Sequence, residues 1–430
     1  MSAEHATVPP AARLAGRRFP GWRMVWALAV TSTVSYGTLF YCFAVMVVPM
    51  RDDLDASTGQ ISLALTIGIA TNGAAAVPVG RWLDRHGARW VMTAGSLLGA
   101  ASLVAWSQAR SLGQLYLAFI GVGVAGAAVL YEPAFAVINT WFRRDRHAAL
   151  LTLTVVAGFA STIFLPLSQA LIDAYDWRRA LLALAVLLGL CAVPQAVVLR
   201  RSPADLGLHP DGDVHDQPVG GDPVASPADV ITTTALSDGE FAGLGGAWRR
   251  PAVRWLTLAA VLETFAVTVV AVHLVAYLTD DGVTPTAAAS SAGALGVMSV
   301  AGRITLTALA GKVGLGRLAA VMVAGQAAGV AALLLLPRPA GLVLFVLLFG
   351  AGFGVMTIAQ ATLLGQYVPE RVYASVGGSQ ALAANAGRVI APAAAGAAIT
   401  LAGYGPVLTA VAACSLGTAA LLLAADRAHR

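Results

Sequence analysis

The sequence predicts an all-α membrane protein whose twelve transmembrane helices form two pseudo-symmetric six-helix bundles. The first observation is composition: 58% of the 430 residues are hydrophobic and 11% are charged, with a mean hydropathy of +0.75. A soluble domain carries roughly twice that share of charge. The second observation is that the apolar residues fall into twelve blocks, each near or above the length of about 18 residues that spans a bilayer as a helix. The third is a polar stretch that separates six blocks from six.

The expected spans begin after a polar tail rich in Pro and Ala. The first apolar stretch is too long for a signal-peptide core, so we expect an uncleaved cytoplasmic tail. Residues 1–200 are predicted to form the first bundle with this tail, residues 201–252 a cytoplasmic linker, and residues 253–430 the second bundle. The twelve spans are expected at residues 24–49, 60–80, 90–108, 114–139, 148–172, 180–199, 253–278, 287–310, 317–336, 341–366, 374–400 and 404–425.

Lys and Arg are concentrated on one side of these spans. With both termini in the cytoplasm, 20 of the 27 lie in cytoplasmic segments, five lie in outer loops and two lie within spans. This is the distribution of the positive-inside rule. The net charge of +5 therefore reflects topology and does not indicate a nucleic-acid partner. We expect a multi-pass protein of the plasma membrane, surrounded by lipid, with both termini cytoplasmic.

The two halves carry weak repeats of each other. In the first half, Ser57-Thr58 is a helix-start signal, followed by a span and a basic turn. In the second half, Thr284-Pro285 is a helix start with Pro at the first position, followed by a span and a turn that again holds Gly and Arg, at 311–317. Duplicated bundles around a linker are typical of secondary transporters, whose site lies between the halves.

The basic turn of the first half has the sequence G-R-W-L-D-R-H-G-A-R, at 80–89. Its arginines are explained by topology, but topology gives no reason for an acid there. We expect Asp84 to pair with a neighbouring helix start or arginine when the cytoplasmic side is closed, which biases the equilibrium between two states. The candidate gating residues are Gly80, Asp84, Arg85, Gly87 and Arg89.

This turn resembles the signature that the major facilitator superfamily carries between its second and third helices, and the six-plus-six arrangement resembles that superfamily along essentially the whole chain. The resemblance implies the major facilitator fold and transport by alternating access. Four stretches resemble the monocarboxylate and oxalate/formate exchanger branch, in which the eighth-helix arginine binds a carboxylate. They are 36–41 followed by Pro49, 141–149 leading to Gly158, 273–277 followed by 280–282, and Gly302-Arg303.

The sequence also departs from the branch. Tyr36 stands where the branch usually carries an acid, and Ser299 stands where animal monocarboxylate carriers carry an aspartate. The first span has no lysine. Because these groups take part in proton coupling in the animal carriers, the resemblance does not imply proton symport by the same route. Gly158 and Pro166 are eight residues apart, so the Gly-Pro signature of drug exporters is absent.

Five ionisable residues lie deep within the predicted spans: Glu132, Glu263, His273, Arg303 and Arg388. A charge at the centre of a membrane helix costs about 2.5–3.5 kcal/mol on insertion scales, so each needs a reason. The two acids and two arginines balance, and two internal ion pairs would account for them. The alternative is that they serve transport, with Glu132, Glu263 and His273 as candidates for proton coupling.

Arg303 and Arg388 are the predicted anion ligands. A guanidinium stays charged, and its fork of donors fits a carboxylate in two parallel hydrogen bonds. Tyr36, Tyr41 and Gln380 are candidates for orienting hydrogen bonds to the substrate, although each could equally be a packing residue with its own partner.

The predicted function is that of a secondary active transporter for a small organic anion, a monocarboxylate, acting as a proton symporter or an exchanger. The sequence has no Gly-Lys-Ser/Thr phosphate loop, so ATP is not the expected energy source. We expect a monomer without cofactor or metal and no enzymatic activity. The alternatives are an exporter of a hydrophobic metabolite or drug, and a membrane enzyme or sensor, for which the sequence holds no triad or metal motif.

Overall fold

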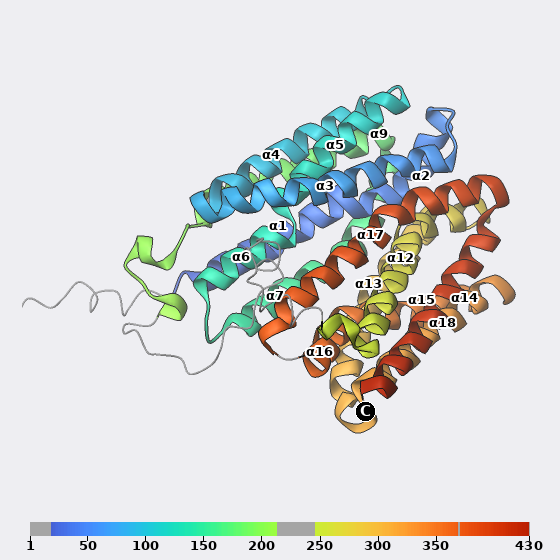
Figure 1. Cartoon of the computed structure of the whole chain (residues 1–430). Coiled ribbons are helices and arrows are strands. Elements are labelled where there is room, and N and C mark those ends of the chain that lie inside the picture. Colours follow the sequence, from blue (N-terminus) through green and yellow to red (C-terminus); the bar gives the residue numbers. More distant parts are fainter. Residues whose placement is uncertain (1–18, 213–245, 369, 430) are drawn as a thin grey trace, which may run out of the picture.

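The structure of the chain, a computed structural model, describes residues 19–212, 246–368 and 370–429. This part of the chain holds twelve helical rods that are long and apolar enough to cross a membrane. The predicted number of spans is confirmed. The N-terminal and C-terminal rods form two groups, coloured blue to green and yellow to red in Figure 1. Part of the predicted linker, 213–245, lies outside the described residues.

The N-terminal half consists of six rods, three of them continuous through a kink and one through a π-helical segment. Their helices are α1 (Gly21–Tyr36), η2 (Gly37–Tyr41) and α2 (Cys42–Asp53), then α3 (Thr58–His86), α4 (Ala88–Ser107), α5 (Leu112–Val129) with α6 (Tyr131–Trp141), α7 (Arg146–Gly158) with α8 (Ala160–Ala174), and α9 (Trp177–Leu190) with α10 (Ala192–Val198).

The C-terminal half repeats this order with fewer interruptions. Its helices are α12 (Pro251–Asp280), α13 (Pro285–Val313), α14 (Leu315–Leu335), α15 (Ala340–Phe353) with α16 (Val355–Tyr367), α17 (Glu370–Ala402) and α18 (Tyr404–His429).

The second rod of each half begins with the expected cap. The Ser57 side chain accepts a hydrogen bond from the Gln60 backbone N–H, and the Gln60 side chain accepts one from the Ser57 N–H, which makes a capping box. Thr284 accepts from the Ala287 N–H, and Pro285 follows at the first helical position. The predicted helix starts are therefore confirmed in both halves.

Five interruptions in the rods were not expected from the sequence. Two of them, at Phe159 and Cys191, separate α7 from α8 and α9 from α10, and the other three lie near predicted site residues. Residues 37–41 of the first rod form a π-helical segment, a feature that often marks functional sites. The fourth rod breaks at Leu130, whose backbone is extended (φ −80°, ψ −154°). The tenth rod, its counterpart in the second half, breaks at Gly354. Hydrophobic periodicity is unaffected by such single-residue breaks, which is why the sequence did not reveal them.

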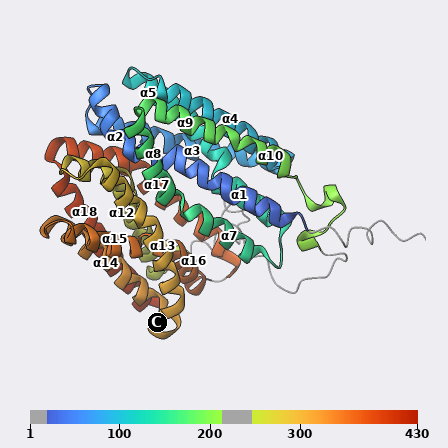
Figure 2. The ribbon, with the colours of Figure 1, turned by 180° about the vertical axis from the view of Figure 1, so that it is seen from behind.

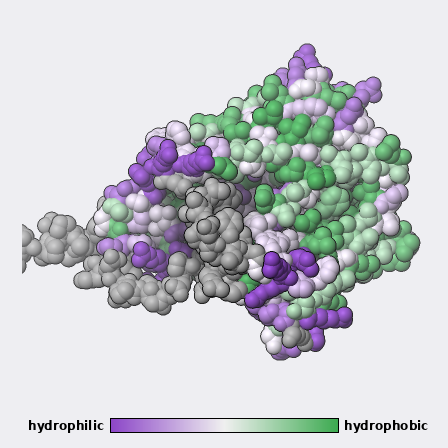
Figure 3. All heavy atoms as spheres, viewed as in Figure 1, coloured by the Kyte–Doolittle hydropathy of each residue, from purple (hydrophilic) through white to green (hydrophobic). Residues whose placement is uncertain are grey.

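The flanks of the molecule are apolar, as lipid requires. Leu117 and Leu401 are 70% and 88% exposed, which would be unfavourable in water but not in hydrocarbon. Hydrophilic residues gather toward the ends of the rods in Figure 3, and hydrophobic residues cover much of the surface between them.

Two short 3-10 turns, η3 (Pro203–Leu206) and η4 (Pro210–Gly212), follow the sixth rod and lie beside the N-terminal half. The carboxylate of Asp211 accepts hydrogen bonds from three consecutive backbone N–H groups, those of Arg143 (2.9 Å), Arg144 (2.8 Å) and Asp145 (3.3 Å). The start of the predicted linker is thus attached to the loop between the fourth and fifth rods.

The two halves diverge toward the end of the molecule that carries the starts of α1 and α12 and the end of α18 (Figures 1 and 2). We call this the basic end, because it carries most of the loop arginines, among them Arg85, Arg143 and Arg200. Because the halves diverge there, the basic end is the open one.

At the opposite, sealed end the halves are in close contact. α3 packs on α17, α8 on α13 and α2 on α12. A methyl group built at Gly396 of α17 would lie 2.8 Å from Oγ of Ser62 in α3. The hydroxyl of Thr162 donates to the carbonyl of Gly293 at 2.8 Å, and Thr286 donates to Asp173 at 2.8 Å. Small residues thus let the backbones approach closely.

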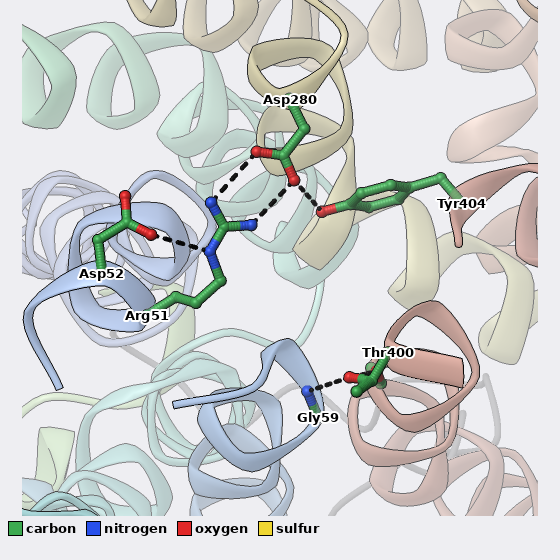
Figure 4. A network of polar contacts seen from close by, with 7 residues as sticks. Arg51, Asp52, Gly59, Asp280, Thr400 and Tyr404 are labelled. Atoms are coloured by element: carbon green, nitrogen blue, oxygen red, sulfur yellow. Dashed lines mark hydrogen bonds and ion pairs between the residues drawn. The ribbon is translucent and has the colours of Figure 1, made fainter. Parts of the chain in front are cut away.

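Four polar side chains also join the halves at the sealed end, and we call them the outer lock (Figure 4): Arg51, Asp52, Asp280 and Tyr404. Arg51 donates to both oxygens of Asp280, at 3.0 and 3.4 Å, and its Nε donates to Asp52 at 3.0 Å. The Tyr404 hydroxyl donates to Asp280 at 3.2 Å. Arg51 therefore has one carboxylate from each half.

Replacing Asp280 by Asn should shift the protein toward a state that is open at the sealed end. The bridge is partly exposed, with side-chain exposures of 29% and 31%, so we expect a loss of about 1 kcal/mol, roughly a fivefold change in population. The measurement is labelling by a membrane-impermeant maleimide of a Ser62→Cys variant, in a background where the native cysteines are serine. Ser62 is fully buried between the halves.

Asp52→Asn is the matched control, because it leaves the bridge between the halves in place. An equal rise in labelling for both variants, or none for Asp280→Asn, would show that the outer lock does not hold this end closed.

Candidate functional site

The interruptions of the rods bring predicted site residues from both halves together. Tyr36 ends α1, Tyr41 ends η2, and Glu132 lies in the first turn of α6, just after the break at Leu130. The charge of Arg388 acts on the hydroxyls of Tyr36 and Tyr41, which belong to the other half. The charge of Arg303 likewise acts on Tyr41. Tyr36, Tyr41, Arg303 and Arg388 are thus coupled across the junction of the halves. Glu132 is coupled to Tyr36 and Tyr131 of its own half.

Arg303 lies on α13 and is partly exposed. Its guanidinium packs against Gly354, where a Cβ atom would collide with Nε of Arg303 and with Oγ of Ser299. The break in the tenth rod thus makes room for the arginine. Its Nη1 is 4.0 Å from where a Cβ on Gly158, in the other half, would lie. Nε of Arg303 is buried and has no hydrogen-bond partner in the part of the chain that the structure describes.

Arg388 is exposed on α17, four residues before Pro392. A proline within a helix leaves the carbonyl four residues earlier without its N–H partner. Among the described residues, neither Arg388 nor Arg303 forms an ion pair with an acid. The alternative of two internal ion pairs is therefore wrong for this conformation.

Glu263 is 3% exposed and lies inside the C-terminal half. Its Oε1 accepts a hydrogen bond from the Gln326 side chain at 2.8 Å, and Gln326 in turn accepts one from Ser415 at 3.2 Å. These residues come from α12, α14 and α18, which pack on one another. The structure thus encloses Glu263 within the C-terminal half, although its Oε2 has no hydrogen-bond partner among the described residues.

His273 and Gln380 also have partners within the C-terminal half. A ring nitrogen of His273 lies 3.3 Å from the carbonyl of Pro392 and donates to it. Gln380 is fully buried and donates to the Thr257 hydroxyl at 2.8 Å. In this conformation, both side chains join α12 to α17 and do not line the opening.

The turn between the second and third rods has the expected glycine. α3 ends at His86, and Gly87 adopts φ 78°, in the region that only glycine enters without strain. Gly80 has open space around its Cα, and Arg85 is exposed at the surface. The guanidinium of Arg89 lies 4.8 Å from the centre of the Trp90 ring. The side chain of Asp84 lies outside the description. Its gating role stays a prediction, and the basic end is open here.

Sequence reasoning missed Tyr131. Its ring lies 4.5 Å from that of Tyr36 and stacks on Phe135 at 5.2 Å, and the charges of Arg303 and Glu132 act on its hydroxyl. The sequence did offer a signal for Tyr131, because it directly precedes Glu132, an acid deep within a predicted span.

Comparisons with known proteins agree with this architecture. The sequence of residues 28–392 matches the Major Facilitator Superfamily. Monocarboxylate transporter 13 of Bos taurus is 32% identical over 271 residues, which are 63% of this chain and 56% of the relative. Monocarboxylate transporter 1 of Mus musculus is 29% identical over 229 residues, 50% of this chain and 46% of the relative. The chain spans about half the length of these relatives.

Solved structures share the fold. A bacterial homolog of the human lysosomal transporter Spinster, in an inward-facing and unoccupied conformation, matches with a TM-score of 0.69 and 17% identity, covering 96% of this chain and 97% of that one. The nucleoside transporter NupG matches with a TM-score of 0.69 and 14% identity, covering 94% and 99%. The predicted resemblance is confirmed, and the chain belongs to the major facilitator superfamily.

Proposed function

We propose that this protein carries a small organic anion, a monocarboxylate, across the plasma membrane by alternating access. Two observations carry the proposal: Arg303 and Arg388 form no ion pair with an acid among the described residues, and both are coupled electrostatically to Tyr41 of the other half. Each guanidinium costs about 2.5–3.5 kcal/mol at the centre of a helix. A transported carboxylate would supply the negative charge that the two guanidiniums lack.

The geometry supports a shared anion site. The two arginines come from different helices of one half, and Tyr41, from the other half, lies within the electrostatic range of both. A carboxylate bound by the arginines can also accept a hydrogen bond from a tyrosine hydroxyl, so the anion would contact both halves. Such a bridging ligand favours the states in which the halves can close around it. The names of the curated relatives, monocarboxylate transporters, point to the same class of passenger.

The proposed topology makes this conformation the inward-open one. The positive-inside distribution supports a cytoplasmic basic end, which is the end that is open. The outer lock then faces the outside, and the substrate would leave toward the cytoplasm. We propose a monomer, since the site lies between two halves of one chain.

An exporter of a hydrophobic compound is the second candidate. The stacked rings of Tyr131 and Phe135 give the same opening an apolar wall. The two candidates differ in the need for the arginines, since a neutral apolar passenger gains nothing from a guanidinium.

Arg303→Ala and Arg388→Ala should each lower monocarboxylate uptake at least about 100-fold, because each removes a fork of two charged hydrogen bonds worth about 1.5–3 kcal/mol apiece. Uptake of radiolabelled lactate, pyruvate and acetate would be measured in proteoliposomes. Arg317→Ala is the control, since Arg317 lies at the basic end beside Asp426. Wild-type rates in both site variants, with drug efflux retained, would favour the exporter.

Tyr41→Phe should raise KM roughly 2- to 12-fold with little change in kcat, because one neutral hydrogen bond contributes about 0.5–1.5 kcal/mol to binding. The same uptake assay over a range of anion concentrations measures it. Tyr367→Phe is the matched control, because that hydroxyl has no hydrogen-bond partner among the described residues and lies at the basic end. An unchanged KM for Tyr41→Phe would remove Tyr41 from the site.

A further inference from the structure

Helix α17 contains a proline close to one of the two anion ligands. Pro392 lies inside the helix and has no N–H to donate, so the carbonyl of Arg388, four residues earlier, lacks its helical partner. A proline at such a position bends a helix. The direction in which the helix leaves this bend therefore determines where the Arg388 guanidinium lies.

The bend is held from the C-terminal half by His273 of α12. Nε2 of the His273 ring lies 3.3 Å from the carbonyl of Pro392, and the ring donates because a carbonyl can only accept. His273 is 3% exposed, and its Nδ1 has no hydrogen-bond partner among the described residues. Within the described chain, the polar contact of this buried ring is thus with the backbone of the bend.

The bend is also held from the N-terminal half. The N–H of Ala393, directly after the proline, donates to the hydroxyl of Thr66 in α3 at 3.1 Å. Two turns further along α17, the hydroxyl of Thr400 accepts a hydrogen bond from the N–H of Gly59 in α3 at 3.3 Å (Figure 4). These contacts cross between the halves, so they break if the sealed end opens.

The part of α17 that carries Arg388 lies against its own half. A Cβ atom built at Gly387, directly before the arginine, would lie 3.0 Å from the carbonyl of Val261 in α12. The part before the proline is therefore in close contact with α12, and the part after it is bonded to α3 of the opposite half. The proline lies where the helix passes from one set of partners to the other.

We propose that His273 and Thr66 are positioning residues for the anion site. They hold the carbonyl of Pro392 and the N–H that follows it, and so fix the bend of α17 and the place of the Arg388 guanidinium. This rests on the proposed function. His273 acts within one half and holds the bend in every state, whereas Thr66 holds it only while the sealed end is closed. Arg388 therefore binds the anion more tightly in this conformation than in one that is open at the sealed end.

The test measures KM and kcat for uptake of radiolabelled lactate and pyruvate in proteoliposomes. His273→Leu removes the donor and should raise KM about tenfold with little change in kcat, because the loss falls on binding. His273→Gln, whose amide N–H can reach the same carbonyl, should bring KM back to within about twofold of wild type.

A second comparison separates positioning from general packing. Lys keeps the positive charge on a flexible stem, so the exact bend of α17 matters less in an Arg388→Lys background. In that background His273→Leu should raise KM less than about twofold, whereas an effect independent of Arg388 would repeat the tenfold rise. A repeated tenfold rise would overturn the inference.

Thr66→Val should raise KM at least about threefold, because it removes the acceptor from the Ala393 N–H. The matched control is Thr162→Val, which also removes a hydrogen bond between a hydroxyl and the backbone of the other half, but at α8 and α13. Equal effects of the two variants would mean that Thr66 only closes the sealed end, and its positioning role would be lost. Thr66→Val carries the test by itself if His273→Leu does not fold.

Two further results would sink the inference while the proposed function stands. One is a wild-type KM in a folded His273→Leu protein, and the other is a KM in His273→Gln as high as in His273→Leu. If the wild-type protein transports neither anion, the proposed function fails, and the inference fails with it.

Discussion

Inside hydrocarbon every backbone N–H and carbonyl needs a partner within the protein, so a membrane helix can be interrupted only where other protein or an aqueous opening receives the freed groups. The π-helical segment at 37–41 and the breaks at Leu130 and Gly354 obey this constraint. Tyr41, at the end of the first, lines a cavity together with residues of the other half. Glu132 lies just after the second, and the guanidinium of Arg303 packs against the third.

The same constraint explains how charge is placed. Arg303 is accommodated because Gly354 leaves room for its guanidinium beside Ser299, and Glu132 begins the helix that restarts after Leu130. An acid at a helix N-terminus is favoured by the unpaired N–H groups there. Two of the interruptions thus lie beside an ionisable side chain, whereas the enclosed Glu263, on an uninterrupted helix, has an amide as its partner.

Hydropathy was sufficient for the fold, because twelve apolar blocks and a one-sided distribution of arginines are properties of long segments. The helix starts at Ser57 and Thr284 were predictable from local capping chemistry. The sequence could not predict which of the deep residues contact one another, because that depends on the direction in which each side chain points from its helix. Arg303 and Arg388 are coupled to Tyr41 of the other half, whereas Gln380 and His273 bind partners inside one half. The outer lock was hidden because Arg51 and Asp280 are 229 residues apart.

Arg51 holds two carboxylates at once, and only one of them belongs to the opposite half. If the halves part at this end, Asp280 leaves, but Asp52 remains next to Arg51 in the chain and is 64% exposed to solvent. The guanidinium then exchanges one of its two carboxylate partners for water and keeps the other. The free energy needed to separate the halves at this end is therefore smaller than if Arg51 lost its only carboxylate.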